Sequence, residues 1–366
     1  MKTIGLIASN YISGDFGKLE DKRTLASLPF GGRYRLIDFA LSNMVNAGLS
    51  TVGIITPFNS GSLIDHVGVG KPWKLDRKVG GMFLMPGSVY GMSQKGIRFP
   101  LKDILDNKAF LTRDSAEYVL VAAGSDVYSM DYTKLIKKHA ESGNSITMCC
   151  KRVENGENYK GYFVKQDAEG TVTEITSGAY GPADYFMDCF VINREYFIQI
   201  IDWFEKVAYL DFFEVIKENF ERVDIGTYMF EGYYGKINTL NDYMKVSHDI
   251  LDMEVSKEIF NHDSPVYTKV QDEPPAFYTD TAKVKNSLIS AGCKIEGTVE
   301  NSILFRSTHV AKGAVIKNSV VMMHGEIGEN TLLYNVICDK YVTVSEDVNL
   351  VGGKESPLVI GKGRKA

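Results

Sequence analysis

The sequence predicts an α/β domain built on a mostly parallel sheet, followed by a C-terminal parallel β-helix. Two observations carry this prediction. Short apolar runs alternate with helical patterns in the first half of the chain, and aliphatic residues recur at six-residue steps near its end. Three prolines, Pro265, Pro274 and Pro275, fall between these regions and indicate a linker.

Four apolar runs of the first half are short and rich in Val, Ile or Leu, and they predict buried strands at 3–8, 52–56, 118–123 and 145–150. Helical patterns over 36–47 and 132–141 lie between them. Strands that alternate with helices predict a mostly parallel sheet covered on both faces. Ligands of such sheets bind at the carboxyl ends of the strands, so the loops after Ala8 and Ala123 are where a site is expected.

A six-residue period runs through the C-terminal region in Val315, Val321, Ile327 and Leu333, with glycines and asparagines interleaved. This period predicts a parallel β-helix whose coils each contain three short strands. An ordinary β-sandwich would instead repeat every two residues. The expected organisation is therefore an α/β domain over 1–250, a crossing segment over 251–280 and a β-helix over 281–366.

The charge, the apolar runs and the cysteines argue against a nucleic-acid-binding, membrane-spanning or zinc-binding protein. The formal net charge is −5, which gives no general attraction to nucleic acid or to an anionic membrane. No apolar run approaches the roughly 20 residues that a membrane span requires, and the N-terminal apolar stretch is too short for a signal peptide. The five cysteines contain no CxxC pair, so we expect reduced thiols, no zinc site and a cytoplasmic location.

Three segments, 23–43, 117–120 and 127–132, carry a resemblance to a known family. They are similar to bacterial glucose-1-phosphate adenylyltransferase, the ADP-glucose pyrophosphorylase of glycogen biosynthesis, and the resemblance extends over essentially the whole chain. It implies a nucleotidyltransferase Rossmann-like domain followed by a left-handed parallel β-helix. It also implies chemistry on ATP and glucose 1-phosphate that yields ADP-glucose and pyrophosphate, with Mg²⁺ held by acidic residues and phosphates held by lysines.

Four positions depart from the pattern that this family would require. The family's phosphate lysine, its two metal-binding aspartates and its sugar-phosphate lysine correspond here to Leu25, Ser125, Lys236 and Gly178. The paired glycines of the first loop are also missing, because Ala8 is followed by Ser9 and Asn10. The ammonium of Lys236 would repel Mg²⁺ but could pair with a phosphate. The sequence therefore predicts an inactive or very weak active site.

A retained scaffold with a lost site resembles the GlgD-type regulatory subunits of this family. That resemblance implies a catalytic subunit as partner, with a heterotetramer as the assembly. No cofactor is then expected in this chain, and Mg²⁺ would be held by the catalytic partner. A phosphorylated metabolite is the expected effector, and the candidate residues for binding its anionic groups are Lys22, Arg23, Arg33 and Arg35.

Other interpretations stay open at the level of sequence. The basic residues of 22–35 could form ion pairs with Asp21 and Asp38 or be solvated. The chain could be an active adenylyltransferase that uses Asp126 as metal ligand and the loop 14–18 for phosphates. It could also be a metabolite sensor that acts without a catalytic partner.

Overall fold

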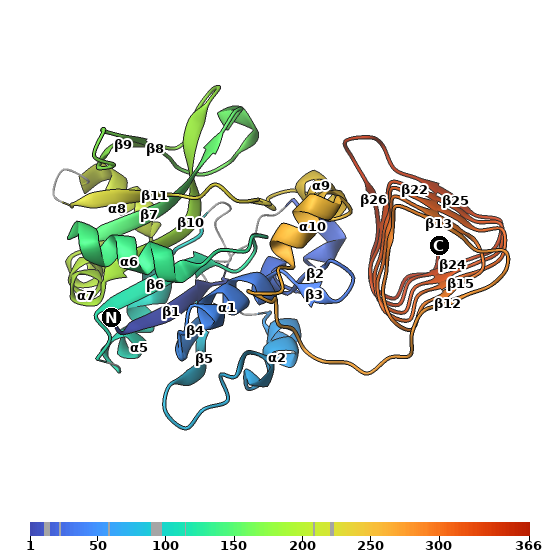
Figure 1. Cartoon of the computed structure of the whole chain (residues 1–366), viewed down its shortest axis with the longest axis horizontal. Helices are drawn as coiled ribbons and strands as arrows, with labels where there is room; N and C mark the ends of the chain where they lie inside the picture. The colour runs from blue at the N-terminus through green and yellow to red at the C-terminus, as the bar shows by residue number, and fades with distance from the viewer. Residues whose placement is uncertain are drawn as a thin grey trace.

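The computed structural model describes residues 1–10, 15–21, 23–57, 59–88, 97–113, 115–207, 209–219 and 223–366. Figure 1 shows an α/β domain joined to a β-helix. Two predicted features fall partly or wholly outside the described residues. They are Lys22 and the first residue of the loop 14–18.

The α/β domain is built on one sheet with the strand order β11-β7-β10-β6-β1-β4-β5. β1 pairs in parallel with β4 and β6, β4 with β5, and β11 with β7, whereas β10 runs antiparallel to β6 and β7. The predicted mostly parallel sheet is thus confirmed. The strands of this order are β1 (Thr3–Ala8), β4 (Thr51–Thr56), β5 (Gly81–Pro86), β6 (Tyr118–Ala123), β7 (Ile146–Val153), β10 (Ala183–Asn193) and β11 (Ile225–Met229).

Shorter elements complete this domain. β8 (Phe163–Gln166) pairs with β9 (Val172–Thr176) and β10, and β2 (Pro29–Phe30) pairs with β3 (Tyr34–Arg35). Single 3₁₀ turns occur at η1 (Gly17–Leu19), η2 (Leu25–Ser27), η3 (Lys71–Trp73), η4 (Gly156–Asn158) and η5 (Glu205–Val207).

Helices cover both faces of the sheet, and each face has its own apolar core. One core contains residues of α1 (Ile37–Asn46), α2 (Gly61–Val67) and α6 (Tyr132–Ser142). The other contains residues of α4 (Leu101–Asp106), α5 (Lys108–Thr112), α7 (Arg194–Trp203) and α8 (Phe212–Asn219). This two-sided coverage explains why the central strands are apolar throughout and do not alternate with polar residues.

Three parallel sheets form the β-helix, which Figure 1 shows nearly end-on as a triangle. The first sheet contains β12 (Phe277–Tyr278), β15 (Lys294–Ile295), β18 (His309–Val310), β21 (Glu326–Ile327) and β24 (Thr343–Val344). The second contains β13 (Lys283–Lys285), β16 (Thr298–Glu300), β19 (Val315–Lys317), β22 (Leu332–Tyr334) and β25 (Asn349–Val351). The third contains β14 (Leu288–Ile289), β17 (Ile303–Leu304), β20 (Val320–Val321), β23 (Val336–Cys338) and β26 (Leu358–Ile360).

A continuous apolar core joins the two domains. It contains residues from the segment around Phe30, from α9 (Leu240–Asp249) and α10 (Met253–Ile259), and from the β-helix strands β17 and β20. The segment after α10 runs alongside α1 before it enters the β-helix. Asn46 Nδ2, in the last residue of α1, donates to Ser264 Oγ at 3.0 Å and to the carbonyl of Pro265 at 3.1 Å. No helix within the described part of the chain is long and apolar enough to cross a membrane.

Candidate functional site

Three of the four positions predicted to lack the family's ligands gather near the carboxyl ends of β1 and β6. Leu25 and Ser125 line one cavity together with Ser9 and Arg98, and the volume of this cavity is only about 10 Å³. A space of that size holds about one water molecule. Lys236 belongs to the buried network described below. Gly178 lies apart on the exposed loop after β9, and its surroundings leave room for a side chain.

The loop after β1 begins with polar side chains that are tied to neighbouring elements. Ser9 Oγ donates to the carbonyl of Ile55 at 2.6 Å, and Asn10 Nδ2 donates to Asp103 Oδ2 at 2.7 Å and to the carbonyl of Ser88 at 2.9 Å. Burial raises the pKa of the Asp103 carboxyl, while the hydrogen bonds from Ser88 and Asn10 act in the opposite direction. The start of this loop is therefore held by side chains, at the place where the family pattern has paired glycines.

Lys236 lies in a buried ion-pair network. Its Nζ lies 3.1 Å from Asp126 Oδ2 and also contacts Asp188 Oδ2. Only 7% of Lys236, 1% of Asp126 and 3% of Asp188 is exposed. Tyr234 Oη donates to the same Asp126 oxygen at 2.9 Å, and the ammonium lies 5.7 Å from the ring centroid of Tyr185. The ammonium thus forms ion pairs with two carboxylates, at the position where the family pattern has a metal-binding aspartate.

Asp188 reaches this network through a local irregularity of β10. Its φ is +50°, which is uncommon for a residue other than glycine, and the register of β10 against β7 shifts in the same stretch. Arg98 Nε lies 2.9 Å from Asp188 Oδ2, and the Arg98 guanidinium donates to Ser125 Oγ at 3.1 Å and to Asn238 Oδ1. We name the four charged residues the site cluster: Arg98, Asp126, Asp188 and Lys236.

Sequence reasoning missed Arg98, Asp188 and Asn238. Asp188 carried a usable signal, because it is a lone carboxylate inside the apolar run 185–192, and a buried charge has to be paired. Arg98 and Asn238 lie outside helices and strands, in segments without any period. The backbone of Arg98 is fixed by Asp211 Oδ2, which accepts its N–H at 2.9 Å, and burial raises the pKa of the Asp211 carboxyl to about 6.

The site cluster as it stands does not fit a Mg²⁺ ion. Mg²⁺ requires oxygen ligands at about 2.0–2.1 Å in octahedral geometry. Here the ammonium of Lys236 occupies the position between Asp126 and Asp188. Asp126 Oδ1 is buried and has no hydrogen-bond partner among the described residues, so one carboxylate oxygen is left over. Within the described ranges, no three His, Cys, Asp or Glu side chains are grouped to hold a metal ion.

A larger cavity adjoins the site cluster on the side of α9. Its volume is about 320 Å³, and it is lined by Tyr159, Tyr233, Tyr234, Lys236, Asn238 and Lys245, among others. Tyrosine rings with hydroxyl, amide and ammonium groups suit a polar ligand with flat apolar faces. The cavity volume lies at the lower end of the range for small-molecule sites.

The arginines predicted to bind an effector take different positions. Arg23 is 5% exposed and donates from Nη2 to both carboxylate oxygens of Asp339, at 2.7 and 2.8 Å. Arg35 is buried and donates to Ser62 Oγ at 2.9 Å. Arg33 is exposed, with its guanidinium carbon 5.3 Å from the ring centroid of Tyr34. The fourth candidate, Lys22, lies outside the described residues.

Lys340 of the β-helix lies near two of these arginines, Arg23 and Arg35. Burial lowers the pKa of Lys340 to about 7, assisted by the positive charges of Arg35, Arg23 and Lys362 and opposed by Asp339. The position between the two domains therefore combines four basic side chains with Asp339, while Asp38 and Asp65 also act on Arg35. We name this group the junction cluster: Arg23, Arg35, Asp339, Lys340 and Lys362.

Comparisons with known proteins agree with this architecture. A nucleotidyl transferase family model matches residues 21–271, and a model described as GlmU-like, C-terminal hexapeptide matches residues 274–356. The glycogen biosynthesis protein GlgD of Bacillus subtilis is 32% identical over 98% of this chain and 96% of its own length. The chain belongs to the family of GlgD and the glucose-1-phosphate adenylyltransferases.

Two other members of this family are glucose-1-phosphate adenylyltransferases. That of Fervidobacterium nodosum is 30% identical over 91% of this chain and 82% of its own length. That of Bacillus cereus strain ZK is 30% identical, with 87% of each chain covered. The resemblance read from 23–43, 117–120 and 127–132 is thus confirmed, as is the order of a nucleotidyltransferase domain and a hexapeptide β-helix.

Proposed function

We propose that this chain is a regulatory, catalytically impaired subunit of a glucose-1-phosphate adenylyltransferase in glycogen biosynthesis. The observation that carries the proposal is the buried ammonium of Lys236 between Asp126 and Asp188. It supplies the positive charge that Mg²⁺ supplies in an active nucleotidyl transferase, but it cannot coordinate a leaving pyrophosphate as a metal does. The Mg²⁺ of the assembly then belongs to the catalytic subunit.

The surroundings of Lys236 support the same conclusion. The cavity between Leu25 and Ser125, at about 10 Å³, has no room for a triphosphate, and Leu25 brings an apolar side chain where the family pattern has a lysine. Arg98 further neutralises Asp188. Admitting a metal would require moving a paired ammonium out of a buried site, which leaves Asp126 without an ion pair and Asp188 with Arg98 alone.

We further propose that the junction cluster binds the anionic group of a phosphorylated metabolite. Its excess of cations suits a phosphate, and arginine presents paired donors to phosphate oxygens. Because the cluster contains residues of both domains, a bound anion would alter how firmly the β-helix is held against the α/β domain. The proposed partner of the whole chain is the catalytic subunit, and the proposed assembly is a heterotetramer.

Back-substitution tests the proposal. The triple variant Leu25→Lys, Ser125→Asp, Lys236→Asp restores the carboxylates and the phosphate lysine of the family pattern. We expect it to gain Mg²⁺-dependent pyrophosphate release from ATP and glucose 1-phosphate, where the unmodified chain shows almost none. A matched control, Lys245→Asp, changes an exposed lysine that lines the adjoining cavity and is expected to gain nothing. Loss of an activity that the unmodified chain already has would contradict the proposal.

An active adenylyltransferase is the second candidate, and one observation favours it. Asp126 Oδ1 is buried and has no partner among the described groups, so it could serve a metal after Lys236 moves away. Under this alternative Asp126→Asn would abolish turnover by the isolated chain. A metabolite sensor without a partner would instead purify from its source cells free of any catalytic subunit, and co-purification distinguishes it from the regulatory subunit.

A further inference from the structure

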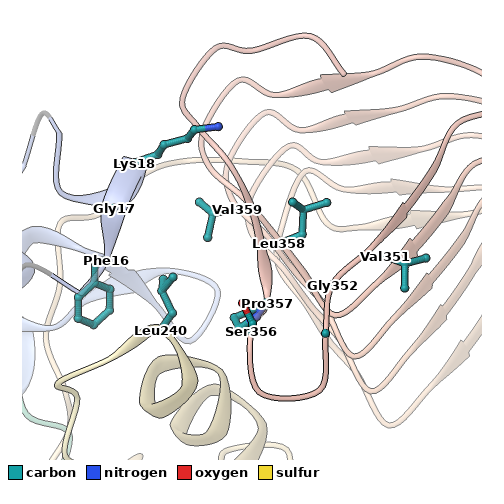
Figure 2. Close-up of a pocket in the computed structure, with 11 residues that line it drawn as sticks. Phe16, Gly17, Lys18, Leu240, Val351, Gly352, Ser356, Pro357, Leu358 and Val359 are labelled. Atoms are coloured by element: carbon teal, nitrogen blue, oxygen red, sulfur yellow. The ribbon is translucent and has the colours of Figure 1, made fainter.

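A cavity of about 310 Å³ lies between the α/β domain and the β-helix, and no residue of either charged cluster lines it. Figure 2 shows it between η1, the start of α9 and the segment from Val351 to Val359. Its walls therefore come from three segments that are distant in the sequence. A cavity of this volume is large enough for a small metabolite.

The walls of this cavity are mostly apolar. Phe16 and Leu240 contribute from the α/β domain, and Val351, Pro357, Leu358 and Val359 contribute from the β-helix. Polar groups are few, and the hydroxyl of Ser356 is one of them. Such walls favour a ligand whose body is hydrocarbon.

One charged side chain borders the cavity. Lys18 is the only lining residue with a formal charge among those that the structure describes, and it forms no ion pair with another described residue. Figure 2 shows its side chain extending from η1 toward the β-helix, and its methylene groups pack against Gly361. A single exposed ammonium beside apolar walls complements one negative charge and not two.

The segment that covers the cavity is well held. Asn241 Nδ2 donates to the carbonyl of Glu355 at 2.6 Å, and Gly353 and Ser356 exchange backbone hydrogen bonds at 3.0 and 3.2 Å. At Gly352 a Cβ atom would come within 2.2 Å of the Asn335 carbonyl oxygen, so only glycine fits the turn out of β25. The Asn241 hydrogen bond thus ties the segment to α9, and the Gly353–Ser356 hydrogen bonds fix the shape of its turn.

We propose that this cavity binds a small monocarboxylate with an apolar body, whose carboxylate pairs with Lys18 and whose hydrocarbon contacts the apolar walls. Such a ligand touches both domains at once, so its binding stabilises the junction between them. The proposal does not depend on the regulatory function proposed above, because it concerns neither the site cluster nor the junction cluster.

The test is binding of hexanoate to the full-length protein. Calorimetry measures the dissociation constant, and the rise in the thermal unfolding midpoint gives a second measure of binding. We expect saturable binding with a dissociation constant of about 1 mM or tighter, which is reasonable for a ligand of this size. Hexanol, which lacks the charge, should bind about tenfold more weakly, because a hydrogen bond to a charged group is lost. Inorganic phosphate, which lacks the apolar body, should not compete.

Two variants and one control locate the site. Lys18→Gln should weaken hexanoate binding about tenfold and leave hexanol binding unchanged. Ser356→Trp, on an exposed position of the covering segment, should abolish binding of both by filling the cavity. Lys354→Gln removes an exposed charge that does not line the cavity and should change nothing. The proposal is wrong if wild-type protein shows no saturable hexanoate binding, or if Lys18→Gln and Ser356→Trp bind it as wild type does.

Discussion

The site cluster is buried throughout, whereas the junction cluster ends at the exposed Lys362, and the two clusters also differ in charge balance. In the site cluster, each cation directly contacts a carboxylate. In the junction cluster, Lys340 faces three other cations and a single carboxylate. A balanced buried cluster resists change, because removing either sign leaves an unpaired charge, whereas an unbalanced one is stabilised by an added anion. Substitutions in the first should therefore act on stability, and those in the second on ligand and pH responses.

The largest expected effect is on the site cluster. Replacing Lys236 by Met leaves Asp126 without an ion pair, and it removes one of the two cations that contact Asp188. We expect a loss of about 3–5 kcal/mol in the free energy of unfolding, measured by urea denaturation. Lys245→Met is the matched control, because the pair of Lys245 with Asp249 is exposed and should contribute at most about 1 kcal/mol. Equal losses in the two variants would contradict the account of the site cluster.

A smaller loss is expected for Asp339→Asn in the junction cluster. The change removes the negative charge that pairs with Arg23, while an amide oxygen remains to accept one hydrogen bond. We expect a loss of about 2 kcal/mol in the same urea experiment. Added phosphate should recover part of it, since the variant leaves the cluster with cations alone. A loss that phosphate cannot reduce would mean that Asp339 acts only as a packing partner.

Lys340→Met should change how stability depends on pH. The folded pKa of Lys340, about 7, lies below its ordinary value of 10.5, so between these values the unfolded chain binds more protons. The contribution of Lys340 to stability therefore rises as pH increases from about 7 to about 9, by about 1 kcal/mol after allowance for its partial exposure. The stability difference between wild type and Lys340→Met, measured by urea denaturation at several pH values, should follow this rise. Parallel pH profiles would contradict it.

The smallest expected effect concerns anion binding. Phosphate binding to the junction cluster should weaken about threefold as pH rises from about 7 to about 8.5, because Lys340 loses its proton over this range. Calorimetry measures this after correction for the ionisation of phosphate itself. Lys362→Gln should weaken binding at every pH without altering the trend. A constant affinity over this range in wild type would show that Lys340 does not take part.

Much of the fold was predictable because it depends on local periods. The strand predictions at 3–8 and 118–123 coincide with β1 and β6, and α1 and α6 lie within two residues of the predicted helices. The six-residue period of the β-helix is interrupted because the coils are not a whole number of six-residue steps long. Val310 pairs with Ile327 and Ile327 with Val344, so each of these coils contains 17 residues and not 18.

The candidate site was predictable only in part. Positions matched to a family pattern, such as Ser125 and Lys236, were named because neighbouring residues fix their alignment. Their partners were not, because Arg98 reaches Ser125 from a loop and Asp188 reaches Lys236 from a bulged strand only in the folded chain. The partner of Arg23 was equally hidden, since Asp339 lies 316 residues further along the chain. Long-range pairs of this kind leave no period in the sequence.

The most direct test of the central claim is pyrophosphate release from ATP and glucose 1-phosphate in the presence of Mg²⁺. It should be measured with this chain alone, with the catalytic subunit alone and with the two mixed. We expect almost no turnover by this chain, and a changed rate or a changed response to phosphorylated metabolites in the mixture. Robust turnover by this chain alone would contradict it and would identify Asp126 as a metal ligand in a working active site.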